Sequence, residues 1–398
     1  MVRTAAPLAL LMLLGAARPG TGSSASWRPR AQDGVVGADE VKASIDRLGN
    51  LEFEIRNTAA RTIRRAPSPT AVPALLQAVG AHTDGYVRFR ALVLLSGFND
   101  PRTRDVMAAM LAEENDRLRA VAYTWFEHNP DPAIVPRLLQ ALEREESEFV
   151  RPPLTRALAA HGDDPRVRKI MPTLVMRGQA FFRSVVIEAL GDYRAAYARE
   201  PITQVAQIDG PLQDDAALAL GKIGDKASLP ILARLQGSAP RESQPAIAAA
   251  ICLLGVNCAS HHPYITRSLE FAIASIGFQE LLRGSAAALA ALGAAGRPDA
   301  IAHLIERGAP TRDPARAAVA LALGTAALRN TQALLDALDG APALVRPATE
   351  LLREAFDMFE EDFEEERFYV TVRRAYWQAP EGSPRRQAAE ALIKGLEF

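Results

Sequence analysis

The chain has 398 residues, of which 48% are hydrophobic and only 6% aromatic, with 46 Lys and Arg residues against 47 Asp and Glu residues. This composition supports a large core in which alanine supplies much of the apolar surface, and small side chains suit closely packed helices. Because the charges are balanced and interleaved, the chain lacks the basic face that a DNA- or RNA-binding protein needs, so we expect no nucleic-acid partner.

The first 25 residues have the features of a signal peptide. Arg3 is followed by thirteen apolar residues at 5–17, and residues 23–25 (Ser-Ser-Ala) fit a cleavage site with small side chains. The apolar run is too short to span a bilayer comfortably, and no later stretch is apolar enough to do so. The sequence therefore predicts a periplasmic or secreted protein, released by removal of residues 1–25, with no stable membrane insertion.

Paired helices are predicted for almost all of the remaining chain. Residues 26–37 are polar with Pro and Gly, which indicates a flexible leader, and amphipathic helical patterns begin at residue 38. Asp-Pro pairs at 100–101, 131–132 and 164–165 are expected to open the second helix of three successive pairs, because Asp caps the first turn and Pro fits within it.

An apolar residue followed by arginine returns at intervals of 31 or 32 residues, and an apolar run that often ends in Gly follows it. Periods of this length indicate stacked helical hairpins, none of which can bury its apolar stripe alone. We expect an all-α solenoid of about ten hairpins: a repeat array over residues 38–340, then capping helices over 341–398. The four regular copies of the pair are Val87-Arg88, Leu118-Arg119, Val150-Arg151 and Phe182-Arg183.

The pattern Val-Arg-x-x-Ala-x-x-x-Leu-Gly, followed by Asp and a second amphipathic helix, resembles the short HEAT-like repeat that bilin lyases also contain. It is clearest in residues 182–192 and 217–225. The resemblance extends from about Ala38 to the C-terminus. It implies a right-handed superhelix that acts as a protein–protein scaffold. An exported chain with scattered cysteines gives no support for bilin-lyase chemistry.

The repeated arginines Arg88, Arg119, Arg151 and Arg183 could grip an acidic partner along the stack. Each of them has an acidic residue nearby, which favours a structural role in local ion pairs and helix caps. The expected acidic partners are Asp84, Asp116, Glu148 and Glu188.

An acidic run at residues 360–366 continues the helical stripe Phe356, Phe359 and Phe363. It lacks the Gly and the alternating oxygen ligands of a calcium loop. The run is therefore expected to be a solvated helix face within a C-terminal cap.

Cys252 and Cys258 are the only cysteines, and His261 and His262 follow them closely. An oxidising compartment permits a disulfide between them, and two small buried thiols are the alternative. The spacing matches no usual structural zinc pattern, so we expect no metal and no cofactor.

No nucleophile, phosphate-loop or zinc-protease motif occurs, and from this we expect that the chain is not an enzyme. The preferred function is a scaffold that holds a protein along an inner row of second helices. The alternatives are an accessory subunit of an exported enzyme complex, or an enzyme with its site in an insertion at Cys258–Tyr264. The polar residues expected to line the inner row are Arg104, Arg137, Gln140, Arg144, Arg166 and Lys169.

Overall fold

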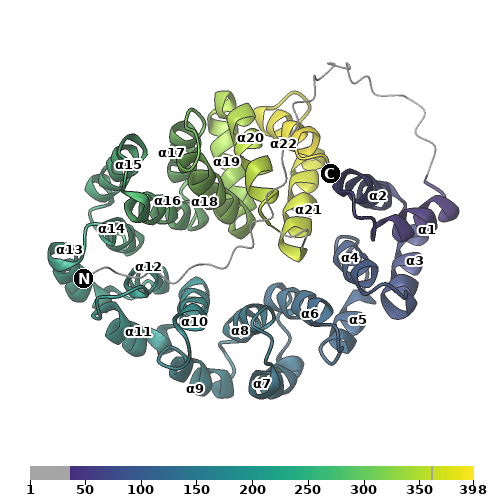
Figure 1. Cartoon of the computed structure of the whole chain (residues 1–398), viewed down its shortest axis with the longest axis horizontal. Helices are drawn as coiled ribbons and strands as arrows, with labels where there is room; N and C mark the ends of the chain where they lie inside the picture. Colours follow the sequence, from purple (N-terminus) through teal and green to yellow (C-terminus); the bar gives the residue numbers. More distant parts are fainter. Residues whose placement is uncertain (1–35, 360–361) are drawn as a thin grey trace.

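The computed structural model describes residues 36–359 and 362–398, and every regular element in these ranges is a helix. The signal peptide and most of the leader that the sequence predicts lie outside the described residues. The helices form a single curved array of hairpins whose two ends come together, so that the molecule is a ring (Figure 1). The expected all-α solenoid is confirmed.

Two concentric rows of helices make up the ring (Figure 1). The inner row contains α2 (Phe53–Arg65), α4 (Gly85–Ser96), α6 (Asp116–His128), α8 (Arg151–Ala160), α10 (Ala180–Asp192), α12 (Gln213–Ile223), α14 (Gln244–Leu253), α16 (Gln279–Ala294), α18 (Ala315–Arg329) and α20 (Val345–Phe356). The outer row contains α1 (Ala38–Arg47), α3 (Ser68–Ala81), α5 (Thr103–Met110), α7 (Val135–Arg144), α9 (Pro165–Leu174), α11 (Arg199–Ala206), α13 (Leu229–Ser238), α15 (Cys258–Ala274), α17 (Pro298–Gly308) and α19 (Thr331–Gly340).

Small residues on the inner helices set the curvature. A Cβ atom added at Gly191 would lie 2.7 Å from the Cα of Ala219, and one added at Gly221 would lie 2.5 Å from the Cα of Ala250. The backbones of α10, α12 and α14 therefore approach one another very closely, whereas most outer helices have their main contacts with inner helices. Because the inner circumference is the shorter one, the helices with the smallest side chains occupy it.

The repeated arginines have the structural role that the sequence favours. Arg88 Nε donates to the carbonyl of Val79 at the end of α3, and Arg183 Nε donates to the carbonyl of Val175 after α9, each at 2.8 Å. A guanidinium at this position also complements the negative end of the helix dipole.

The acidic partners of these arginines are not the expected ones. Arg88 pairs with Glu113 and Arg119 with Glu145, both from the ends of outer helices. Asp84 instead caps α4 by accepting from the amide of Tyr86. Proximity in sequence was thus a poor guide to the pairing, because the arginine bridges two hairpins.

Two further helices, α21 (Phe363–Gln378) and α22 (Pro384–Gly395), complete the C-terminal end. α22 packs on α19 and α20, while α21 packs on α22 and also touches α4 and α6 at the other end of the chain. This last contact closes the ring (Figure 1). Of the helices described, none combines the length and the apolar character needed to cross a bilayer.

Candidate functional site

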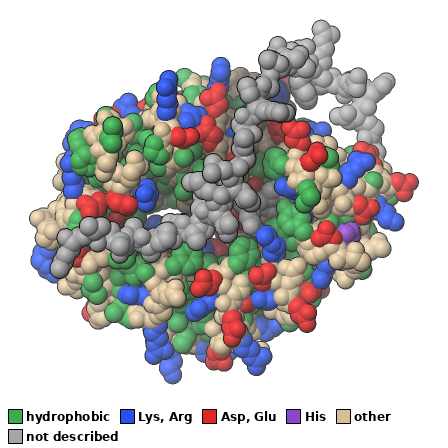
Figure 2. All heavy atoms as spheres, viewed as in Figure 1, with side chains coloured by type: hydrophobic (Ala, Val, Ile, Leu, Met, Phe, Trp, Pro, Cys, Tyr) green, Lys and Arg blue, Asp and Glu red, His purple; other side chains and the backbone are tan. Residues whose placement is uncertain are grey.

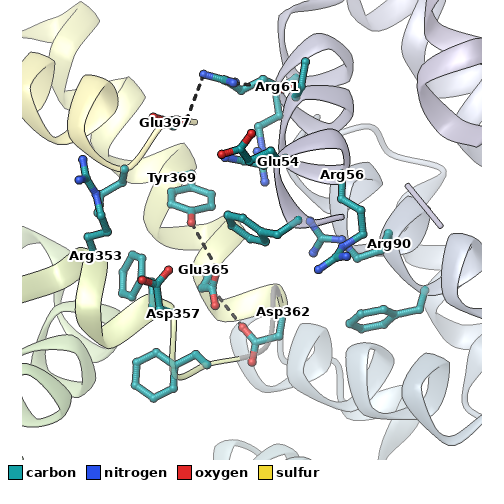
Figure 3. A pocket seen from close by; sticks show the side chains of 18 of the residues that line it. Glu54, Arg56, Arg61, Arg90, Arg353, Asp357, Asp362, Glu365, Tyr369 and Glu397 are labelled. Atoms are coloured by element: carbon teal, nitrogen blue, oxygen red, sulfur yellow. Dashed lines mark hydrogen bonds and ion pairs between the residues drawn. The ribbon is translucent and has the colours of Figure 1, made fainter. Parts of the chain in front are cut away.

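A cavity of about 950 Å³ lies where the first repeats face the C-terminal helices (Figure 3). α2 and α4 form one wall, and α20, α21 and the end of the chain form the other. The lining combines carboxylates and six aromatic rings with six arginines. The arginines are Arg56, Arg61, Arg64, Arg90, Arg117 and Arg353. We call this cavity the seam cavity, and the contact between α21 and the N-terminal repeats the seam.

One ion pair of the seam joins residues 302 positions apart. Arg64, in the last turn of α2, lies 2.7 Å from Glu366 of α21, and the two side chains are 5% and 1% exposed. Burial alone would lower the pKa of Arg64, but the charge and the hydrogen bond of Glu366 raise it. A Cβ at Gly97 would lie 2.7 Å from the Glu366 carboxylate, so the glycine at the end of α4 leaves the notch that this carboxylate fills.

A second set of seam contacts involves His128, the last residue of α6. Its Nε2 atom lies 2.7 Å from the carboxylate of Glu364, and its ring stacks on Phe363. Burial alone would raise the pKa of Glu364, but His128 and Arg367 lower it to about 2. No local pattern in the sequence points to this contact of His128. Its role in the seam was missed because Glu364 lies 236 positions away.

The expectation of a solvated acidic helix face is wrong for the part of the run that is described. Asp362 caps α21 by accepting from the amides of Glu364 and Glu365, and Glu365 and Glu366 are buried. Acidic side chains in the first turn of a helix are stabilised by its dipole. Here they also face cations from distant repeats, which no local pattern in the sequence reveals.

A ladder of charged residues continues from the seam along the inner row. Arg156 of α8 lies 2.8 Å from Glu127 of α6 and 3.0 Å from Asp192 of α10, and Lys222 of α12 lies 2.7 Å from Asp192. Arg329, at the end of α18, reaches across the ring to within 3.8 Å of Glu127 and 3.9 Å of Asp192. Ion pairs therefore cross-link this part of the ring interior.

Glu127, His128 and Glu364 bring one ligand-type atom each to within 4.8 Å of one another. Their neighbours are cationic, because Arg156 lies 2.8 Å from Glu127 and Arg367 pairs with Glu364. Guanidinium groups already neutralise both carboxylates, so the arrangement fits an ion-pair network better than a divalent-cation site.

A second cavity, of about 490 Å³, opens on the inner surface between α12, α16 and α18. Alanine is the commonest residue in its walls, which also contain Leu218, Leu321 and Met358, and charged residues such as Arg283 and Arg329 lie among them. Acidic and basic side chains are interspersed over the face of the ring shown in Figure 2. The ring interior thus offers apolar and charged surfaces side by side.

The expected inner position of the six partner-binding residues is wrong. Arg104 lies on α5, Arg137, Gln140 and Arg144 lie on α7, and Arg166 and Lys169 lie on α9, all of which belong to the outer row (Figure 1). All six are exposed on these outer helices. Two of them pair locally, Arg104 with Asp131 and Arg166 with Asp164. An amphipathic stripe reveals which face of a helix is buried, but it does not reveal whether the helix lies in the inner or the outer row. The first helix of each hairpin carries the small residues, and for that reason it occupies the inner row.

Cys252 and Cys258 form a disulfide in the structure, with their Cα atoms 4.4 Å apart. It joins the end of α14 to the start of α15. The predicted insertion at Cys258–Tyr264 is not a loop, because these residues form the first turns of α15. His262 lies 3.1 Å from Asp299 and 3.2 Å from His303, on the outer row and away from the seam cavity.

Comparisons with known proteins identify the repeats. Residues 41–125 match HEAT repeats, and residues 212–238 match the PBS lyase HEAT-like repeat. The chain therefore contains HEAT and HEAT-like repeats, as the sequence pattern indicates. No curated protein sequence matches the chain significantly.

Solved structures of low sequence identity are similar to parts of this chain. The Escherichia coli protein YibA is 17% identical with a TM-score of 0.41, and the match covers 56% of this chain and 83% of that one. The complex of CpcE and CpcF of phycocyanin lyase from Nostoc sp. PCC7120 is 19% identical with a TM-score of 0.40, and the match covers 66% of this chain and 97% of that one. Importin beta is 11% identical with a TM-score of 0.40, and the match covers 90% of this chain and 62% of that one.

The expectation that the chain is not an enzyme is overturned by one of these findings. A repeat family named for a lyase matches residues 212–238, so the absence of local catalytic motifs does not separate this chain from enzymes. The reasoning failed because it relied on motifs of adjacent residues. Charged groups in this ring meet across 302 positions and more, as Arg64 meets Glu366 and Arg61 meets Glu397, a juxtaposition that no linear motif describes.

Proposed function

We propose that the chain is an exported scaffold that holds a protein partner in the interior of its ring, with the seam cavity at the centre of the contact. The observation that carries the proposal is the lining of that cavity, where arginines and aromatic rings from both ends of the chain face one another (Figure 3). Arginine and aromatic side chains are the types that dominate the energetics of protein interfaces.

The two walls of the cavity supply complementary chemistry. α2 contributes Arg56 and Arg61 together with Phe53, whose side chain is 51% exposed. The opposite wall contributes Asp357, Arg353 and Tyr369. Tyr369 is half-buried beside Glu365, Glu366 and Arg64, and its loss of contact with water raises the pKa of its hydroxyl well above the usual value. It therefore stays a neutral hydrogen-bonding group at physiological pH.

A photocrosslinking residue at Thr58, which is exposed and lines the cavity, tests the proposal. Crosslinking in the cell envelope of the source organism should give one dominant adduct with a protein that copurifies in fixed proportion. The matched control carries the same residue at Lys169, which is exposed on outer helix α9. The proposal fails if the Lys169 chain captures the same protein equally well, or if Thr58 captures none.

A further inference from the structure

The seam has the character of a contact between two molecules. α21 carries three glutamates in its first turn and reaches α4 and α6, whose residues lie far away in sequence. Its glutamates pair with Arg64 at the end of α2 and with His128 at the end of α6. Its more extensive packing is with α22 on its own side of the seam. α21 can therefore leave the N-terminal repeats without losing its place in the C-terminal cap.

The receiving surface consists of the ends of three inner helices. Arg64 lies in the last turn of α2, Gly97 follows the end of α4, and His128 ends α6. These helices are positioned by packing within the N-terminal repeats, because α3 packs on α4 and α5 packs on α6. The surface is thus built by the repeats themselves, and its shape does not depend on α21.

Three side chains at the start of α21 are recognised. Phe363 stacks on the ring of His128, Glu364 pairs with the same histidine, and Glu366 enters the notch at Gly97 to meet Arg64. The ring of Tyr369 lies under the Arg64 guanidinium, with the centroid 4.9 Å from its Cζ atom. The recognised element is therefore a helix that begins Phe-Glu-x-Glu.

We infer that the surface formed by Arg64, Gly97 and His128 is a docking site for a helix with an acidic, aromatic first turn, and that a partner protein carrying such a helix displaces α21 and opens the ring. The inference rests on the proposed function, since it names the class of partner. α21 is the occupant in the closed ring. The charge complementarity seen there fixes the chemistry that a competitor must present.

Two observations favour displacement over a permanent seal. The seam borders the cavity of about 950 Å³, so the two ends meet over a partly hollow junction. Within the repeats, by contrast, inner helices approach so closely that an added methyl group would reach the next backbone. The ring is thus least well packed where it closes, and there it can open without unfolding a hairpin.

A labelled peptide with the sequence of residues 362–378 tests the inference on the full chain. Wild-type protein should bind it weakly, because the attached α21 competes at high effective concentration. The double variant Glu364→Gln with Glu366→Gln weakens that competitor and should bind the peptide at least about thirtyfold more tightly by fluorescence anisotropy. Adding Arg64→Gln to the double variant should remove most of this gain.

Matched controls separate recognition from loss of folding. Circular dichroism should show unchanged helix content in the double variant, and small-angle scattering should show a larger radius of gyration. A peptide with Gln in place of Glu364 and Glu366 should bind at least about thirtyfold more weakly. If the variant is folded and open but does not take the wild-type peptide, or if it stays closed, the inference is overturned.

Other outcomes are equally decisive. If wild-type chains dimerise through α21 at micromolar concentration, a second copy is the occupant and the assignment to a partner protein is wrong. Loss of crosslinking from Thr58 would overturn the proposed function without affecting peptide binding. Failure of peptide binding with intact crosslinking would overturn only the present inference, so the two can be told apart.

Discussion

The junctions between neighbouring hairpins and the seam between the two ends solve the same packing problem in different ways. At the junction of α12 and α14, Gly221 lets two backbones come into contact, with small apolar side chains around the point of contact. At the seam, charged and aromatic side chains meet beside a large cavity. Close backbone packing occurs between successive inner helices and holds the superhelix together. The charged and aromatic contact occurs at the seam, where the array of hairpins ends.

Two arginines make the comparison sharp. Arg156 in the inner ladder and Arg64 at the seam are both buried and both pair with a buried glutamate. Arg156 links three successive hairpins, while Arg64 links the two ends of the chain. Similar local chemistry should therefore have different consequences, because only the first contact must break for the repeats to unfold.

The largest predicted effect uses this pair. Arg156→Leu leaves the Glu127 carboxylate, which is 2% exposed, without its nearest cation, and should lower the free energy of unfolding by about 3–5 kcal/mol in urea titrations. Arg64→Leu should leave the urea midpoint almost unchanged and increase the radius of gyration instead. Equal destabilisation by the two substitutions would show that the seam is as structural as the ladder.

The sequence predicted the repeat well because the repeat is local. Asp-Pro caps are confirmed at Asp131 and Asp164, whose side chains accept from the amides of Ala133 and Arg166. The period of about 31 residues and the terminal glycines likewise reflect contacts between adjacent hairpins. Each of these signals depends on residues that are close in sequence, and each recurs.

The candidate site was not predictable in the same way. Glu366 and Arg64 meet only because the accumulated curvature of all the hairpins brings the two ends together. A small error in the rotation per repeat would separate them, and nothing periodic marks either residue. The expectation that the second helices form the inner row was wrong for a related reason. Stripes of apolar residues define the buried face of a helix but do not reveal toward which side the array curves.

The second prediction concerns the hairpin junctions alone. Gly221→Ala places a methyl group against the backbone of Ala250 and should lower the free energy of unfolding by about 1–3 kcal/mol, measured by urea denaturation. Its control is Gly237→Ala, at a helical position with no atom nearby, which should stabilise the protein by up to about 1 kcal/mol. A neutral result at Gly221 would mean that neighbouring hairpins can shift apart as freely as the two ends do.

A third prediction tests the covalent link between α14 and α15. Alkylation without reductant should label neither Cys252 nor Cys258, and replacing both by Ser should cost about 2 kcal/mol, because the bond closes a short loop. The link lies within the repeats, so peptide binding at the seam should not change. Labelling of both thiols in protein from an oxidising compartment would contradict the disulfide.

The smallest effect is a pH dependence at the α12–α14 junction. Burial raises the pKa of Asp214 to about 6, assisted by Asp215 and Glu242 and opposed by a hydrogen bond from Ser243. A raised pKa means that the folded state holds the proton more tightly, so the contribution to stability is complete below the unfolded pKa of about 4 and is lost as pH rises through about 6. At neutral pH the ionised Asp214 therefore opposes folding.

The free energy of unfolding of Asp214→Asn should consequently exceed that of wild type by about 1 kcal/mol near pH 7.5 and by almost nothing near pH 4, in paired urea titrations. Asp100→Asn provides a control of opposite sign, because the hydrogen bonds from Arg102 lower the pKa of Asp100 to about 2. That substitution removes a favourable carboxylate and should not stabilise the protein at either pH. Equal stability of wild type and Asp214→Asn at both pH values would mean that the ionised Asp214 does not destabilise this junction.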